Sequence, residues 1–85
     1  MYKIFWQTKA VRQLEKLKNK KVKIKLIEGV DELKRWPDCK NVLPLKNHKY
    51  SFRLRVGNYR VFFDIERELR IIEIEEVKKR DERTY

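Results

Sequence analysis

Residues 50–63, Tyr50-Ser-Phe-Arg-Leu-Arg-Val-Gly-Asn-Tyr-Arg-Val-Phe-Phe, decide the fold of this chain. Apolar and polar residues alternate on both sides of Gly57-Asn58, a dipeptide typical of two-residue hairpin loops. A loop of this length fixes which residues face each other across the two strands. The expected cross-strand pairs are Val56 with Tyr59, Arg55 with Arg60, and Arg53 with Phe62.

The two faces of this predicted hairpin differ in chemistry. One face is apolar apart from two phenol groups, and we expect helices to cover it; its residues are Tyr50, Phe52, Leu54, Val56, Tyr59, Val61, Phe63 and Ile65. The other face carries Ser51, Arg53, Arg55, Arg60 and an exposed Phe62. Opposed like charges destabilise a sheet by up to about 1 kcal/mol. The Arg55–Arg60 pair therefore favours a phosphate site, with Phe62 free to stack on an unpaired base; a solvated face is the alternative.

The flanking segments predict two helices between strands. A short strand over Tyr2–Trp6 precedes a helix that begins at Thr8, and Asn19 ends this helix. A second helix runs from about Lys20 to Trp36, where Pro37 stops it; Gly29 weakens it by roughly 1 kcal/mol relative to alanine. Residues 37–47 show no period and predict a loop.

Beyond the hairpin, a turn near Glu66–Glu68 leads to a third strand of this meander over Leu69–Val77. The polar segment Lys78–Tyr85 forms a basic C-terminal tail. The chain is thus predicted to be one α+β domain, residues 1–85, in the order β-α-α-β-β-β. The helical hairpin should pack on one face of a small, mainly antiparallel sheet. If Glu66 pairs with Leu69, Arg60 faces Glu75 and forms a salt bridge with it.

Composition limits the partners. The chain has 85 residues, 42% of them charged, and a net charge of +10, whereas charged residues usually make up about 25%. Nucleic acid is the first candidate partner, an acidic protein the second and an anionic membrane the third. The single Cys39 excludes an intrachain disulfide and suits a reducing cytosol. No signal peptide or membrane span is evident, so we expect a cytoplasmic location.

The basic residues that would bind RNA lie on the hairpin, the preceding loop and the tail. They are Lys46, Lys49, Arg55, Lys78, Lys79 and Arg83, together with the aromatic Phe62. His48, between two of the lysines, is interpreted as a solvated loop histidine, with a proton-transfer role left open. No glycine-rich phosphate loop, metal-ligand spacing or Ser-His-Asp set occurs, so we expect neither a metal nor a cofactor.

The element order and the Arg-Leu-Arg-Val-Gly-Asn-Tyr-Arg stretch, followed by a Lys-Arg…Tyr ending, resemble the RelE/ParE toxin superfamily. These are small basic toxins of prokaryotic toxin–antitoxin pairs, and the resemblance covers nearly the whole chain. It implies metal-independent cleavage of mRNA on the ribosome, in which the RNA 2′-OH attacks the adjacent phosphodiester. It also implies a cognate acidic antitoxin.

By the same resemblance, Arg60 and Arg80 would stabilise transition-state charge, Tyr85 would act as base or stacking platform, and Arg53 would support them. Ser51 stands where a second basic residue is expected, and Glu75 where an apolar or small one is. Two other functions remain open: a ParE-like inhibitor of DNA gyrase, and a non-catalytic module that binds RNA or ribosomes.

Overall fold

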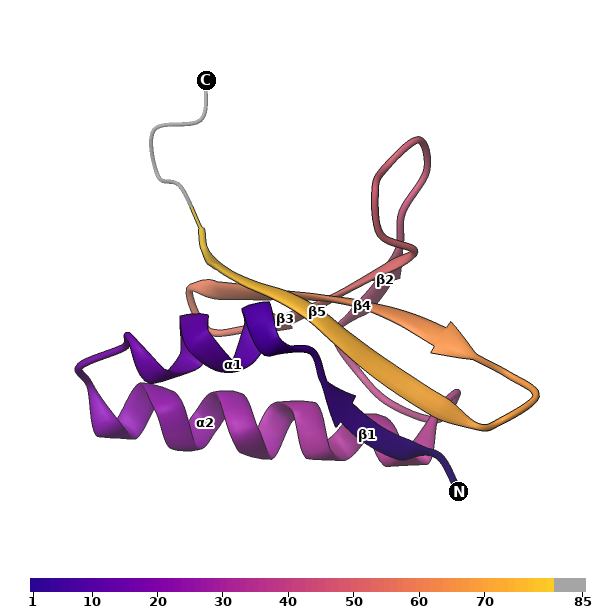
Figure 1. Cartoon of the computed structure of the whole chain (residues 1–85), viewed down its shortest axis with the longest axis horizontal. Coiled ribbons are helices and arrows are strands. Elements are labelled where there is room, and N and C mark those ends of the chain that lie inside the picture. Colours follow the sequence, from indigo (N-terminus) through magenta and orange to yellow (C-terminus); the bar gives the residue numbers. More distant parts are fainter. Residues whose placement is uncertain (81–85) are drawn as a thin grey trace.

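A computed structural model of the chain describes residues 1–80. Its elements are β1 (Lys3–Trp6), α1 (Thr8–Glu15), α2 (Lys20–Asp31), the 3-10 helix η1 (Glu32–Arg35), β2 (Val42–Pro44), β3 (Phe52–Val56), β4 (Tyr59–Glu66) and β5 (Ile71–Lys79). The strands form one sheet in the order β1-β5-β4-β3-β2. β1 runs parallel to β5, and the other neighbours are antiparallel (Figure 1). The α+β architecture is as expected.

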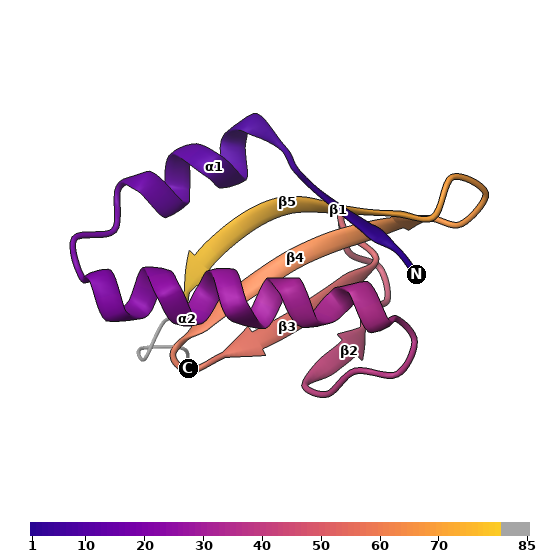
Figure 2. The same ribbon diagram turned by 90° about the horizontal axis from the view of Figure 1, so that it is seen from below.

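Both helices cover one face of the sheet and leave the opposite face open (Figure 2). The core between the layers is formed by Leu26, Val30 and Leu33 below and Val61, Phe63, Ile72 and Ile74 above, all at most 1% exposed. Trp36 closes one end of the core, edge-on to Phe52 with ring centroids 4.9 Å apart. Burial of this apolar layer is the main force that holds helices and sheet together.

Local sequence explains how α2 begins and how closely it packs. The first helix ends at Glu15 and not at Asn19 as expected. The side chain of Asn19 instead accepts hydrogen bonds from the backbone N–H groups of Lys21 and Val22 and so caps α2. A Cβ on Gly29 would lie 2.8 Å from Cγ2 of Val56. Glycine thus allows α2 to approach β3, which offsets its unfavourable helix propensity.

The hairpin register is confirmed. Val56 pairs with Tyr59, Arg55 with Arg60 and Arg53 with Phe62. Gly57 supplies the positive φ, 56°, at the first loop position. Because side chains alternate across a strand, this register places the two arginines of β3 on the face away from the helices.

Two details of the sheet differ from the prediction. Residues 37–47 are not entirely loop, because Val42–Pro44 forms β2 against β3. A three-residue strand with a proline at its end carries too little periodicity to be recognised, and proline is tolerated there because β2 is an edge strand.

None of the helices in residues 1–80 is long and apolar enough to cross a membrane.

The second difference is the register of β5. The strand extends to Lys79, and Glu75 is an extra residue opposite the Phe62–Phe63 step of β4. The turn after β4 is also longer than expected, so Glu66 pairs with Ile71 instead of Leu69, which shifts the register by two residues. The β-bulge shifts the pairing by one further residue, so Arg60 faces Lys78 and not Glu75. The expected Arg60–Glu75 salt bridge was therefore wrong.

Candidate functional site

The open face of the sheet is organised in rows of side chains that run across β3, β4 and β5. The first row is cationic, the second has an aromatic centre, and the third is anionic. In order, the rows are Arg55–Arg60–Lys78, Arg53–Phe62–Glu76, and Asp64–Glu73. The charge of the face thus changes sign over the length of a few residues.

The cationic end of this face forms a pocket of about 160 Å³. Its lining consists of Arg53, Arg55, Gly57, Tyr59, Arg60 and Arg80. Among the residues that the structure describes, every charged one in that lining is an arginine. The backbone N–H of Arg80 donates to the carbonyl of Asn58 at 2.6 Å, which ties the residue after β5 to the hairpin loop. Three of the four predicted catalytic residues, Arg53, Arg60 and Arg80, are therefore brought together.

Arg53 is the most constrained of these arginines. Its Nε is buried and has no hydrogen-bond partner among the described residues. Burial, followed by the guanidinium groups of Arg60, Arg55 and Arg80, lowers the pKa of Arg53 from its usual value. Arginine nevertheless remains protonated at neutral pH. An arrangement of mutually repelling, incompletely paired guanidinium groups can be relieved by an anion with several acceptor oxygens, such as a phosphate.

The anionic end satisfies its own polar groups. The carboxylate of Asp64 accepts the backbone N–H of Ser51 at 2.8 Å, and Nε2 of Gln7 donates to Glu73 at 2.8 Å. Burial raises the pKa of Glu75, and a hydrogen bond with Asp64 and the negative charges of Asp64 and Glu73 raise it further. Within residues 1–80, no three His, Cys, Asp or Glu side chains gather in a way that could hold a metal ion.

Glu76 lies between the two ends and is buried, at 8% exposure. Its carboxylate forms ion pairs with Lys9 at 3.5 Å and with Lys78 at 3.8 Å. Lys78 is thus partly neutralised by a neighbour on its own strand. The neighbouring arginines Arg55 and Arg60 form no ion pair with any acidic side chain of residues 1–80.

Two aromatic side chains depart from the prediction. Phe62 is only 7% exposed, because the imidazole of His48 stacks on it with centroids 5.1 Å apart. Tyr50 precedes β3 and packs beside Phe62 on the open side, with centroids 5.8 Å apart, instead of joining the helix-covered face. His48 is an exposed loop residue, as expected, and its ring is in addition held against Phe62. Sequence reasoning missed this cluster because the path of residues 45–51 depends on tertiary contacts.

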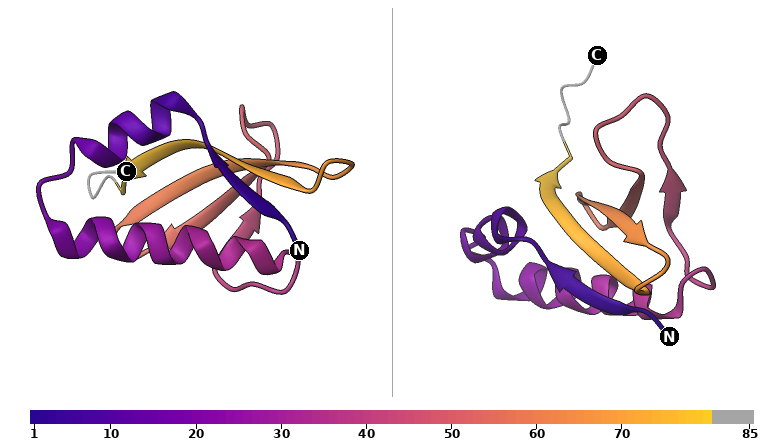
Figure 3. Two further views of the ribbon diagram at one scale, coloured as in Figure 1. Left: turned by 60° about the horizontal axis from the view of Figure 1, so that its bottom comes forward. Right: turned by 45° about the vertical axis from the view of Figure 1, so that its right-hand side comes forward.

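The other predicted RNA-binding residues surround the pocket less closely. Lys46 and Lys49 are exposed on the segment between β2 and β3, and Lys79 is exposed at the end of β5. This β2–β3 segment rises from the sheet on the side opposite the helices (Figure 1). The right-hand view of Figure 3 shows the same segment standing clear of the helical layer. Arg83 and Tyr85 lie outside the described residues.

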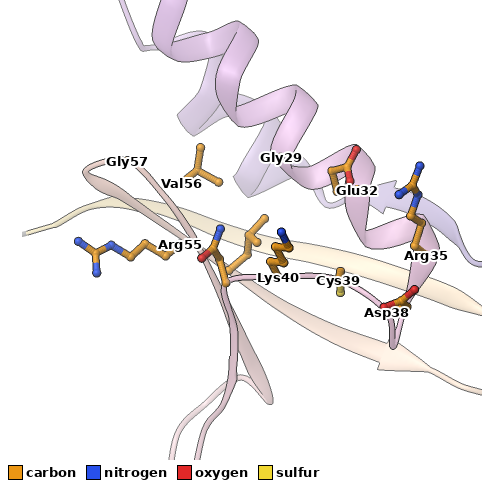
Figure 4. Close-up of a pocket in the computed structure, with 11 residues that line it drawn as sticks. Gly29, Glu32, Arg35, Asp38, Cys39, Lys40, Arg55, Val56 and Gly57 are labelled. Carbon is orange, nitrogen blue, oxygen red and sulfur yellow. The ribbon is translucent and has the colours of Figure 1, made fainter.

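A larger cavity, of about 610 Å³, lies between α2–η1, the segment 38–41 that precedes β2, and the end of β3. Figure 4 shows Val56 pointing toward α2 near Gly29, with Glu32 and Arg35 at the helical side. Acidic and basic side chains mix in its wall, which lacks the single sign of charge that marks the arginine pocket. We therefore place the candidate site at the arginine pocket.

Comparisons with known proteins agree with this architecture. The sequence profile described as "ParE toxin of type II toxin-antitoxin system, parDE" matches residues 4–84. A search of curated proteins finds no match.

Solved structures match over most of the chain. The toxin–antitoxin complex RelBE2 from Mycobacterium tuberculosis matches with 28% identity, a TM-score of 0.79 and coverage of 93% of this chain and 98% of that one. The archaeal RelE–RelB complex from Pyrococcus horikoshii OT3 matches with 24% identity, a TM-score of 0.79 and coverage of 95% and 97%. The isolated RelE toxin of E. coli matches in fold at 17% identity and a TM-score of 0.78, with coverage of 95% and 86%. The chain therefore belongs to the RelE/ParE family of type II toxin–antitoxin toxins.

Proposed function

We propose that this toxin inhibits translation by cutting mRNA on the ribosome in the cytoplasm. The observation that carries the proposal is the pocket in which Arg53, Arg55, Arg60 and Arg80 gather with no acidic residue of the described 1–80 in its lining. A sequence selected for stability alone would not place Arg55, Arg60 and Lys78 in one cross-strand row, because opposed like charges are unfavourable. A polyanionic substrate supplies the missing counter-charge.

The proposed reaction is an attack of the RNA 2′-OH on the adjacent phosphorus. The P–O5′ bond breaks, which leaves a 2′,3′-cyclic phosphate and a 5′-OH. One proton leaves the attacking 2′ oxygen for a base, and another reaches the departing O5′ from an acid. The phosphorane between these states carries extra negative charge, and fixed cationic donors stabilise it more than they stabilise the substrate. The scheme calls for no metal or other cofactor.

Each arginine has a proposed role in this scheme. Arg60 and Arg80 bind the non-bridging oxygens as charge develops on them. Arg53, whose Nε is buried with no hydrogen-bond partner among residues 1–80, adds positive charge for the same oxygens. Tyr85 is proposed as the base or as a stacking platform. A free tyrosine titrates near ~10, so as a base it would need cationic neighbours to lower its pKa.

An acidic antitoxin is the proposed physiological partner. The net charge of +10 makes an acidic protein a favourable ligand. Structures of the relatives from M. tuberculosis and P. horikoshii are toxin–antitoxin complexes. We propose that the antitoxin of this chain covers the arginine pocket and thereby blocks access of RNA.

Inhibition of DNA gyrase is a second candidate function. The observation in its favour is that the matching sequence profile is that of ParE toxins. In that case the target is a protein, and the arginines perform no phosphoryl chemistry.

One experiment separates the two functions. Purified toxin is added to a translation reaction programmed with one defined mRNA, and the mRNA is read by primer extension. We expect discrete cuts within codons, and we expect them only when ribosomes are present. Intact mRNA, together with gyrase-dependent DNA breaks in cells that express the toxin, would favour the gyrase reading. Intact mRNA with toxin bound to ribosomes would indicate a non-catalytic binding module.

A further inference from the structure

The segment that links β2 to β3 has a defined shape. The backbone N–H of Leu45 donates to the carbonyl of Ser51 at 2.9 Å and closes the loop at its base. The N–H of Ser51 donates to Asp64 at 2.8 Å, which fixes the same end to β4. The loop therefore presents its tip, with His48, above the open face of the sheet.

His48 is held in this loop by two contacts of different kinds. Its ring stacks on Phe62 with an interplanar angle of 13°. Its Nδ1 accepts the backbone N–H of Tyr50 at 3.0 Å. A nitrogen that accepts a hydrogen bond carries no proton, so in the neutral ring the hydrogen lies on Nε2. The orientation of the imidazole is thus set by the fold, although the side chain itself is exposed.

The aromatic stack adjoins the arginine pocket. Phe62 lies directly across the β3–β4 ladder from Arg53, which lines that pocket. The ring of Tyr50 flanks the stack, and Nζ of Lys49 lies 5.5 Å from its centroid. Sites for single-stranded nucleic acid commonly combine a cationic pocket with an exposed aromatic ring. The pocket binds the phosphate, and the ring stacks on the base.

We propose that His48 is a stacking platform for an unpaired nucleobase of the strand whose phosphate occupies the arginine pocket. Phe62 holds the ring from beneath, and the exposed imidazole extends the stack by one base. His48 is therefore a positioning residue that orients the RNA and takes no part in proton transfer. This inference rests on the proposed RNA-binding function and adds to it a contact with the base.

The test uses a short single-stranded RNA with 2′-O-methyl groups, which cannot be cut, and 2-aminopurine as a fluorescent base. Binding is measured for wild type, His48→Ala, His48→Phe and Arg60→Ala. We expect His48→Ala to weaken binding about 5- to 100-fold and to abolish quenching of the 2-aminopurine. His48→Phe should retain both affinity and quenching, because phenylalanine stacks but cannot transfer a proton. Thermal unfolding shows whether each variant is folded.

Salt dependence provides the second readout. His48→Ala should leave the slope of log affinity against log salt unchanged, whereas Arg60→Ala should lower it by about one unit. Wild-type affinity in His48→Ala, or loss of affinity in His48→Phe as large as in His48→Ala, would overturn the stacking role while leaving the proposed function intact. Absence of binding of this free RNA by wild type would overturn the base-stacking role alone, because the proposed cleavage takes place on the ribosome and is tested there separately.

Discussion

The two ends of the open sheet face differ in how far hydrogen bonds within the chain compensate their charged side chains. At the acidic end, Asp64 and Glu73 accept hydrogen bonds from Ser51 and Gln7, and Glu75 forms a hydrogen bond with Asp64. At the basic end, the chain provides no such relief within residues 1–80 for the guanidinium groups of the pocket. Charges that a fold compensates internally are structural, and charges that it leaves uncompensated mark the place where a ligand binds.

Charge reversal of two arginines in the cationic row should have the largest effect, and the quantity it changes is the affinity for RNA. We expect Arg55→Glu/Arg60→Glu to weaken binding of uncleavable single-stranded RNA by more than about 100-fold, because each charged hydrogen bond contributes about 1.5–3 kcal/mol. The slope of log affinity against log salt should fall by about two units. Titration of a labelled oligonucleotide at several salt concentrations measures both quantities.

Its control is Glu75→Gln, which changes a charge at the opposite end of the same face. This variant should bind RNA at least as well as wild type, since it removes a negative charge. Equal loss of affinity in the two variants would mean that the position of the charge on the face does not matter.

A smaller effect of opposite sign is expected for stability. Arg55→Glu replaces a like-charge pair with an ion pair opposite Arg60, so the free energy of unfolding should rise by up to about 1 kcal/mol. Urea unfolding measures it, with Arg67→Glu, an exposed turn residue, as the control for net charge. A destabilised Arg55→Glu would show that the row carries no electrostatic strain.

The smallest effect is a pH-dependent change in the free energy of unfolding, and it arises at the acidic end of the face. The pKa of Glu75 is raised above its ordinary 4.5, so the folded state favours the protonated carboxyl. The stabilisation from this group is fully present below about pH 4.5 and is lost as the pH rises through the raised value. Glu75→Gln should therefore increase the free energy of unfolding at pH 7 by a few tenths to about 1 kcal/mol.

This gain should disappear near pH 4, where both side chains are neutral. Urea unfolding across this range checks the prediction, with Glu68→Gln in the exposed turn as the matched control. A gain that is constant with pH would contradict the role assigned to the carboxyl.

Local sequence predicted the basic half of this face well and its surroundings less well. Gly57-Asn58 fixed the register, and with it the Arg55–Arg60 pair. The pairing of Arg60 with Lys78 was not predicted, because it depends on the longer turn that pairs Glu66 with Ile71 and on the bulge at Glu75, and neither has a clear local signature. Burial of Phe62 was missed because it depends on His48, which lies 14 positions earlier and reaches the face only through the closed 45–51 loop.

Cleavage rates at one codon provide the most direct test of the central claim, that the uncompensated arginines cut mRNA. Wild type, Arg60→Ala, Glu75→Gln and Arg67→Ala are compared on ribosomes programmed with one mRNA, under single-turnover conditions. We predict that Arg60→Ala cuts about 100- to 1,000-fold more slowly, as expected for loss of one transition-state donor. Glu75→Gln and Arg67→Ala should cut at close to the wild-type rate. Wild-type cleavage by a folded Arg60→Ala would contradict the account.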